Sequence, residues 1–503
     1  MTEGASTRSL TWLEGAGAPG LGLFLACLAA ITAFRLAALA VNGTDLYMDE
    51  AQYWTWSREL ALGYYSKPPL IAWLIHGATS VCGDGEACIR LPSTLLHAVT
   101  AALVYAIAAE LYDRRVAFWA GLGYALLPAV SLSSGIISTD VPLLAAWALA
   151  VLAFARLMTA PSWQAAALLA LALGAGLNAK YAMAYFVLCA ALYFAVAPER
   201  RTRLREPHLW LALLGGVALI APNLIWNATN GFVTFAHTAD NARWQGIPFH
   251  PGKAAEFVMS QFGVFGPILF GALLVILWRA ASRPWELAAA DKLLLAFSLP
   301  ILAIVTAQAF ISRAHANWAA PAYVAAVVLV VAAMMRDRAW GWMRAGFLIN
   351  AALALLIAAA TWQAGRFALP GIGDPLARTL GNRELAELVR SEIARAGHDG
   401  RPVGSVLTDD REIAAALAYY GRDLPVPVLS WRSGNAPRSH FESASPFTAA
   451  AAMPALLVTD GSPPASLTSE FASVTPDEAR IIAAGAHDTR TVHVSLLDRY
   501  QGR

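Results

Sequence analysis

The stretch of sequence that decides the fold is Tyr47 to Arg90, which reads YMDEAQYWTWSRELALGYYSKPPLIAWLIHGATSVCGDGEACIR. It directly follows the first strongly apolar run, residues 21–41. Two carboxylates stand side by side at Asp49 and Glu50, and tyrosine, tryptophan and lysine residues follow them. Carboxylates accept protons from hydroxyl groups, lysine neutralises phosphate, and aromatic rings stack on sugar faces. The same residues also suit an aromatic belt at a membrane surface, so the rest of the chain must decide between these interpretations.

Composition indicates an integral membrane protein. The chain has 503 residues, of which 58% are hydrophobic and 14% are charged, whereas about a quarter of the residues in a soluble domain are charged. The formal net charge of +2 gives no sign of a nucleic-acid partner. Residues 1–19 lack the apolar core of a secretory signal, and we expect them to form a short cytoplasmic tail.

Apolar runs of near-bilayer length predict about eleven transmembrane helices. The chain is therefore expected to be a polytopic α-helical protein that spends most of its length in the lipid bilayer. The runs lie at residues 21–41, 91–111, 116–137, 141–158, 163–178, 181–197, 208–226, 257–278, 293–311, 318–335 and 343–363.

The distribution of basic residues predicts the orientation. With the N-terminus in the cytoplasm, most arginines and lysines fall in short cytoplasmic loops, above all in the cluster at 200–205, as the positive-inside rule requires. The first loop, residues 42–90, then faces the periplasm or lumen, as does the chain after the last span. The alanine-rich composition suggests a bacterial source, and therefore the inner membrane.

Under this orientation the chemically unusual residues gather in the outer loops, whereas the cytoplasmic loops are short and plain. A functional site built from several loops at one membrane face is the natural inference. Besides the first loop, its candidate residues are Asp140, Lys180, Tyr181, Arg243, Arg313 and His315.

Residues 380–503 have the composition of a soluble domain. Alternating strand and helix patterns predict a small α/β domain, and it contains neither a GxGxxG motif nor a P-loop. Helices are predicted at 381–397 and 410–420, and strands at 403–407, 426–429, 455–458 and 491–497.

Taken in order, the outer-loop motifs resemble those of a known family. They are DE at 49–50, GYYSKPPLIAW at 63–73, STDVPL at 138–143, AKY at 179–181 and RAHANWAAP at 313–321. This set resembles the GT-C glycosyltransferases of the protein O-mannosyltransferase and lipid A aminoarabinose transferase type. The resemblance covers about residues 20–365, which would form the GT-C domain.

The resemblance implies transfer of a sugar from a polyprenyl-phosphate donor to a lipid, glycan or protein acceptor at the periplasmic face. Asp49 matches the acid of the family's first loop and is the candidate catalytic base, and Asp140 matches a second outer-loop acid. Glu50 is the third catalytic candidate, but it points about 100° away on the same helix and should play a lesser part.

The leaving polyprenyl phosphate is anionic and needs charge stabilisation. Basic groups on the outer face could supply it, and aromatic or polar neighbours could hold the substrates. The expected substrate-binding residues are Lys67, Lys180, Arg58, Arg243, Arg313, His315, Tyr65 and Tyr181.

Two further features of the loops concern metals and cysteines. Some family members have an acid just before the Lys-Pro pair, where this chain has Ser66, so no metal ligand is assigned. A divalent metal remains possible through His315 together with Asp49 or Glu50. Cys82 and Cys88 flank a short loop and could form a disulfide on an oxidising side.

Two other classes of protein were weighed against the glycosyltransferase. A polytopic transporter or lipid flippase would place ionisable groups at mid-span, whereas here Arg35 is the main such residue and lies near a helix end. A membrane-anchored binding protein would not need acids and bases in several outer loops. The sugar and the acceptor stay open, with lipid A, another lipopolysaccharide part, a cell-wall polysaccharide and a protein all possible.

Overall fold

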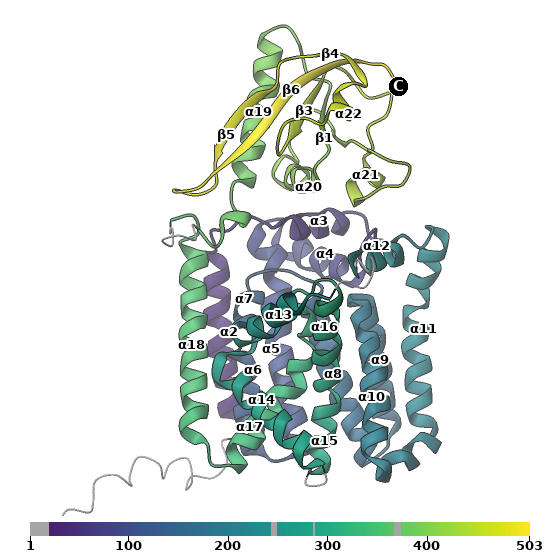
Figure 1. Ribbon diagram of the computed structural model, residues 1–503, viewed down its shortest axis with the longest axis vertical. Coiled ribbons are helices and arrows are strands. Elements are labelled where there is room, and N and C mark those ends of the chain that lie inside the picture. Colours follow the sequence, from purple (N-terminus) through teal and green to yellow (C-terminus); the bar gives the residue numbers. More distant parts are fainter. Residues whose placement is uncertain (1–19, 243–248, 285–286, 367–373, 503) are drawn as a thin grey trace, which may run out of the picture.

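The computed structural model describes residues 20–242, 249–284, 287–366 and 374–502. A bundle of apolar helices occupies one half of its long axis, and a smaller domain with a mixed sheet lies against one end of the bundle (Figure 1). The expectation of a polytopic helical protein with a C-terminal α/β domain is confirmed. The predicted tail, residues 1–19, lies outside the described residues.

Each predicted span has a helical counterpart. Six helical stretches of the described part, one of them the run Ala289–Ile311, are long and apolar enough to cross a membrane, and shorter apolar helices pack among them. An additional short apolar helix, Leu70–Cys82, lies within the first outer loop. The unbroken helices are α2 (Leu21–Ala40), α5 (Glu86–Leu111), α8 (Asp140–Thr159), α9 (Trp163–Ala179), α10 (Tyr185–Val196), α11 (Pro207–Thr229), α17 (Ala322–Arg336) and α18 (Trp340–Trp362).

Three of the predicted spans are broken in the middle. In each, the second helix carries proline in one of its first two positions, where the missing N–H costs nothing, although the same proline would disrupt a continuous helix. A hydropathy pattern counts apolar residues and does not register such breaks. The broken pairs are α6 (Arg114–Ala125) with α7 (Pro128–Ser133), α13 (Pro251–Phe265) with α14 (Pro267–Ser282), and α15 (Ala289–Ala296) with α16 (Leu299–Ile311).

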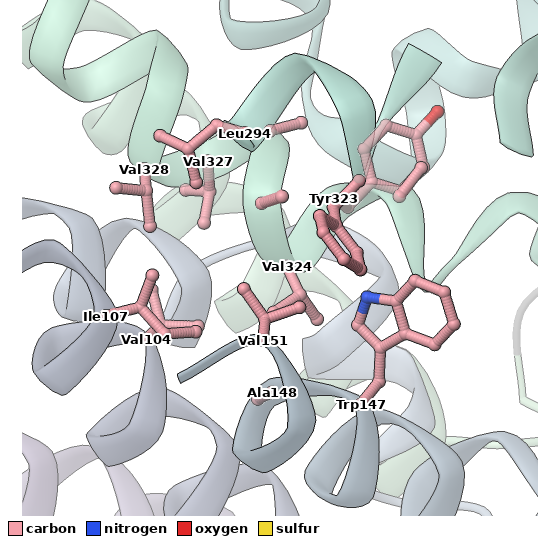
Figure 2. Packing of buried hydrophobic residues seen from close by; sticks show 14 of the residues in the cluster. Val104, Ile107, Trp147, Ala148, Val151, Leu294, Tyr323, Val324, Val327 and Val328 are labelled. Atoms are coloured by element: carbon pink, nitrogen blue, oxygen red, sulfur yellow. The ribbon is translucent and has the colours of Figure 1, made fainter. Parts of the chain in front are cut away.

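The centre of the bundle is α17, in which every side chain from Ala322 to Met334 is buried. Its valines and alanines are small enough for neighbouring helices to approach closely, which is how helices gain contact energy in lipid. Figure 2 shows α17 packed against residues of α5, α8 and α15. The labelled residues are Val104, Ile107, Trp147, Ala148, Val151, Leu294, Tyr323, Val324, Val327 and Val328.

The C-terminal domain contains the predicted helices and strands. Two strands that were not predicted, β4 and β5, extend its sheet by pairing with β6. Its sheet has the order β2-β1-β3-β6-β4, with β5 also paired to β6. Strand β1 runs parallel to β2 and β3, whereas β6 runs antiparallel to its neighbours. The predicted elements are α19 (Asn382–His398), β1 (Ser405–Thr408), α20 (Arg411–Tyr420), β2 (Val428–Ser430), β3 (Ala455–Thr459) and β6 (Thr489–Tyr500), and the additional ones are α21 (His440–Ala444), α22 (Ala465–Thr468), β4 (Phe471–Val474) and β5 (Glu478–Ala483).

The first outer loop is the surface on which this domain lies. Its helices α3 (Met48–Ser57) and α4 cover the end of the bundle, with α12 (Val233–Ala242) beside them (Figure 1). Trp54 and Trp56 of α3 belong to the same buried cluster as Val389 and Ile413 of the C-terminal domain. Loop and domain therefore share one hydrophobic core.

Polar contacts reinforce this docking. The Arg383 guanidinium donates to a carboxylate oxygen of Asp45 at 2.8 Å, and the Tyr419 hydroxyl donates to the Asp84 carbonyl at 2.6 Å. Both contacts join the C-terminal domain to the segments that flank α3 and α4. The position of α3 is therefore fixed from the domain side as well as from the bundle.

Candidate active site

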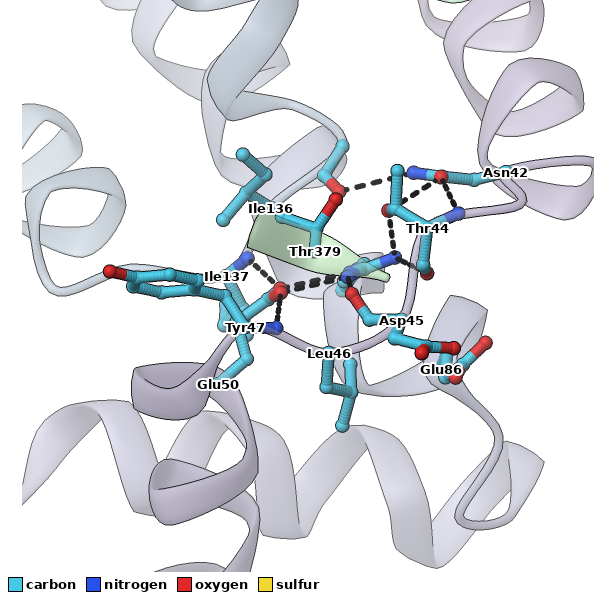
Figure 3. Close-up of polar contacts among 12 residues, drawn as sticks. Asn42, Thr44, Asp45, Leu46, Tyr47, Glu50, Glu86, Ile136, Ile137 and Thr379 are labelled. Carbon is cyan, nitrogen blue, oxygen red and sulfur yellow. Dashed lines mark hydrogen bonds and ion pairs between the residues drawn. The ribbon is translucent and has the colours of Figure 1, made fainter. Parts of the chain in front are cut away.

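The adjacent acids Asp49 and Glu50 have different environments. Glu50 is buried, and both of its oxygens accept hydrogen bonds of 2.8 Å from the guanidinium of Arg90. Its carboxylate also accepts from the backbone N–H of Tyr47 at 3.0 Å and of Ile137 at 2.9 Å. Figure 3 shows Glu50 within this network. The contacts support the lesser, structural part expected for Glu50, because its oxygens are occupied by protein donors.

Asp49, which points about 100° away from Glu50 on α3, has a side chain that is 40% exposed. Its carboxylate forms an ion pair with Arg411, the first residue of α20 in the C-terminal domain. Arg411 also donates through Nε to Oε1 of Gln52 at 3.0 Å. The Glu50 carboxylate caps α3 by accepting from the backbone N–H of Tyr47, so Asp49 is not needed as a helix cap.

Asp140 begins α8 and connects two other outer segments. Its Oδ1 accepts from the ammonium of Lys180 at 2.7 Å, and its Oδ2 accepts from the amide of Asn317 at 2.7 Å. Lys180 ends α9, and Asn317 lies in the short helix η4 (Ala316–Ala319). Three segments that are distant in sequence thus meet at one carboxylate.

Lys67 lies within electrostatic reach of both acids. Burial lowers the pKa of its ammonium, and the nearby charge of Lys180 lowers it further, while Asp49 and Asp140 act in the opposite direction. Within the described residues, the Lys67 ammonium makes no hydrogen bond or ion pair of its own. It is a cation within electrostatic range of two carboxylates, with its donors available to an anionic ligand.

His237 and Tyr65 form the border between this cluster and a cavity. Burial lowers the pKa of His237 to about 4, with contributions from the positive charges of Lys67 and Arg411, so its imidazole is neutral at pH 7. The ring lies 5.4 Å from that of Tyr65, whose hydroxyl donates to the Pro437 carbonyl at 2.8 Å. Both residues line a cavity of about 1290 Å³ between the bundle and the C-terminal domain.

Arg313 and His315 approach the cluster from the loop after α16. The buried Nε of Arg313 has no hydrogen-bond partner among the described residues. Burial lowers the pKa of His315, and the charges of Arg313 and Lys180 lower it further. His315 therefore lies within electrostatic range of both Arg313 and Lys180.

Two of the expected substrate-binding residues have protein partners of their own. Arg58 forms an ion pair of 3.0 Å with Asp84, in the turn between α4 and α5, and it also lines the cavity of about 1290 Å³. The Tyr181 hydroxyl donates to Oδ1 of Asn223 at 2.8 Å, which gives Tyr181 a structural contact with α11. Arg243 lies outside the described residues.

The described residues contain no group of three or more histidine, cysteine or acidic side chains that could hold a metal ion. Ser66 is buried at the position where an acid could have contributed a ligand.

The structure joins Cys82 to Cys88 in a disulfide next to the turn that carries Asp84.

Sequence reasoning missed two residues that contact the candidate acids. Arg411 was assigned only to a predicted helix, and 362 positions separate it from Asp49. Asn317 was noted only as part of an outer-loop motif. A pattern within one segment gives no signal for such pairs, because the contacts depend on how separate segments pack.

Comparisons with known proteins agree with this geometry. Residues 66–226 match the family described as Dolichyl-phosphate-mannose-protein mannosyltransferase. The chain is 34% identical over 431 residues to Lipid A galacturonosyltransferase RgtD of Rhizobium johnstonii, an alignment that covers 86% of this chain and 89% of that protein. It is also 26% identical over 260 residues to Lipopolysaccharide core galacturonosyltransferase RgtA of the same organism, covering 51% of each chain.

A solved structure has the same fold. The crystal structure of ArnT from Cupriavidus metallidurans bound to undecaprenyl phosphate matches with a TM-score of 0.64 and 17% sequence identity, and the match covers 97% of this chain and 98% of that one. At this level of identity the likeness concerns the fold alone.

The helical bundle, the docked sheet domain and the acid–base cluster at their junction define a membrane glycosyltransferase of the GT-C class. The predicted enzyme class is thereby confirmed, in preference to a transporter, a flippase or a binding protein. The chain belongs to the PMT/ArnT family of glycosyltransferases, whose members use polyprenyl-phosphate sugar donors.

Proposed function

We propose that this protein transfers galacturonic acid from a polyprenyl-phosphate donor to lipid A at the periplasmic face of a bacterial inner membrane. Similarity to the lipid A galacturonosyltransferase over nearly the whole chain supports this choice of sugar and acceptor. In this proposal residues 20–365 form the catalytic domain and residues 380–503 form a periplasmic domain. Charge asymmetry of the loops supports the orientation.

The observation that carries the proposal is the convergence of Asp49 and Lys67 from the first loop with Asp140 from a second outer segment. Lys180, Arg313 and Arg411 add further positive charge around the two acids. A uronic acid linked to a polyprenyl phosphate carries negative charge on both the sugar and the phosphate. A site in which cations outnumber carboxylates suits that donor better than it suits a neutral sugar.

In the proposed reaction Asp49 accepts the proton of an acceptor hydroxyl as its oxygen attacks the anomeric carbon of the donor sugar. The bond between that carbon and the phosphate oxygen breaks, and its electron pair remains on the phosphate. The departing polyprenyl phosphate therefore gains one negative charge, which Lys67 and Arg313 neutralise. The proton then passes from Asp49 to water.

The acceptor headgroup needs space beside this acid. The cavity bordered by Tyr65 and His237 is large enough for a sugar headgroup and is lined by both the bundle and the C-terminal domain. The acceptor's acyl chains would remain in the membrane below it.

The test is an assay of the purified protein in lipid vesicles with polyprenyl-phosphate galacturonic acid and lipid A, read by mass spectrometry of the lipid. We expect one added uronic acid per acceptor, and no product from the Asp49→Asn variant. Parallel reactions with polyprenyl-phosphate mannose and aminoarabinose test the choice of sugar. Transfer of either sugar in preference to galacturonic acid, or no transfer to lipid A, would overturn the proposal.

A further inference from the structure

We propose that Arg411 of the C-terminal domain is a positioning residue of the transferase site, which fixes the carboxylate of Asp49 in its working orientation. This inference rests on the proposed role of Asp49 as the base. It gives the C-terminal domain a direct part in the reaction, in addition to its docking on the first loop.

The backbone that carries Arg411 is fixed. Arg411 begins α20, and the carboxylate of Asp410 caps that helix by accepting from the backbone N–H groups of Glu412 and Ile413 at 2.6 and 2.9 Å. One face of α20 is buried in the core shared with α3, through residues such as Ile413 and Leu417. The guanidinium therefore extends from a rigid base toward the bundle.

Two different residues of α3 orient the guanidinium. Its Nε donates to Oε1 of Gln52 at 3.0 Å, and its Nη2 forms the ion pair with Asp49. Gln52 is fully buried and so has a fixed position. The planar fork of arginine can satisfy both acceptors at once, whereas the single nitrogen of lysine has no such geometry. Gln52 thus sets the direction from which Arg411 contacts Asp49.

The charge of Arg411 acts on the other members of the site. It helps to lower the pKa of His237 and of Lys67, although burial is the largest cause for both. Arg411 is therefore close enough to stabilise anionic groups in the same cluster.

Docking of the domain does not require this ion pair. The shared hydrophobic core and the contact between Arg383 and Asp45 already hold the domain on the first loop. A partly exposed ion pair contributes little to stability. Loss of Arg411 should thus leave the fold in place and act on Asp49.

The test compares steady-state kinetics of the full-length protein with those of Arg411→Gln, Arg411→Lys and two control variants. We expect Arg411→Gln to lower kcat by about tenfold to a hundredfold, because misplacement of a reacting group by an ångström has effects of that size. The donor KM should change less than threefold and the thermal midpoint should stay near that of the wild type. Arg411→Lys should recover part of kcat.

The controls separate positioning from docking. Arg490→Gln removes an arginine of the same domain that pairs with Asp460, and it should leave the kinetics unchanged. Arg383→Gln weakens docking, and it should lower the thermal midpoint and expose the junction between bundle and domain to protease.

An unchanged kcat in Arg411→Gln would overturn the inference, as would a loss that comes with the protease sensitivity of Arg383→Gln. Failure of the proposed function has a different signature. If the wild type transfers a sugar other than galacturonic acid, the proposed substrate is wrong, but the Arg411 comparison can be made with the sugar that is transferred.

Discussion

The guanidinium of Arg90 holds both carboxylate oxygens of Glu50 at 2.8 Å, and each side chain is only 2% exposed. Arg90 also donates to the carbonyls of Thr44 and Asp45, at 3.1 and 2.7 Å. This buried pair ties α5 to the segment that enters α3. Helix α3, which carries Asp49, is therefore attached to the bundle through Glu50.

Removing one partner of this pair should destabilise the protein. We expect Arg90→Ala to lower the free energy of unfolding by about 3–5 kcal/mol, because it leaves the Glu50 carboxylate buried without its counter-charge. Thermal unfolding in detergent would measure the effect. Arg58→Ala is the matched control, since Arg58 pairs with Asp84 at the surface and should cost at most about 1 kcal/mol. Equal losses of unfolding free energy in the two variants would contradict the role of Arg90 in attaching α3 to the bundle.

Asp49→Asn tests the proposed base. Asparagine keeps the shape of the side chain but cannot accept the proton, so we expect the transfer rate to fall by at least about a hundredfold. Because Glu50 supplies the capping bond of α3, the variant should fold normally. Steady-state rates and a thermal midpoint together provide the check. A variant that keeps most of its activity would make Asp140 the next candidate.

Lys67 should give donor binding a characteristic pH dependence. Burial, together with the charge of Lys180, lowers the pKa of its ammonium, so it loses its proton at a lower pH than an ordinary lysine. The charged form binds phosphate, and affinity should therefore fall as pH rises through that lowered pKa. Lys67→Arg should remove this fall, because a guanidinium stays charged. Lys67→Ala should weaken binding by about 1.5–3 kcal/mol at neutral pH.

Donor-binding titrations over a range of pH values would provide the measurement. The phosphodiester of the donor keeps a constant charge over that range, so the protein is the source of any change. Identical pH profiles for the wild type and Lys67→Arg would exclude Lys67 as the group that titrates.

Asp140 and Lys180 should behave as a coupled pair. Each single variant, Asp140→Asn or Lys180→Gln, leaves one charge in the site without its partner at 2.7 Å. We expect the double variant to be less impaired than the sum of the singles, with a coupling energy of about 0.5–3 kcal/mol in the activation free energy. A double-mutant cycle on kcat/KM measures it. Strict additivity would show that the ion pair has no part in the reaction.

The proposed topology predicts which surfaces a membrane-impermeant thiol reagent reaches in intact cells. Gly397 is exposed near the end of α19 and has room for a side chain, which makes Gly397→Cys a suitable probe of the C-terminal domain. Ser282→Cys, exposed at the last residue of α14 and next to a loop that the charge distribution predicts to be cytoplasmic, is the matched control. We expect labelling from outside at 397 and not at 282. The reverse pattern would place the site in the cytoplasm.

The fold was predictable from the sequence where a single segment contains the whole signal. Apolar length located the spans, and alternating patterns located β1, β3 and β6. The strands β4 and β5 were missed because they are short or largely exposed, and their residues show little of the alternation that marks a half-buried strand. The breaks in the spans were missed because apolar content does not change across them.

The site was predictable in its residue types but not in its pairings. The outer-loop motifs single out Asp49, Lys67, Asp140 and Lys180, which the structure brings within electrostatic range of one another. Nothing in those motifs indicates that Asp140 binds Lys180, or that Asp49 binds Arg411. Such pairings follow from the packing of distant helices.

The pairing of Asp49 with Arg411 has a consequence for the synthesis of the enzyme. The two residues are 362 positions apart, so the first loop leaves the ribosome long before its partner exists. Their contact cannot form until translation has passed residue 411 and α20 has folded against α3. A nascent or prematurely terminated chain can thus insert its helices into the membrane while its acid still lacks this partner. The site can therefore be assembled only after α20 has been synthesised and has folded against α3.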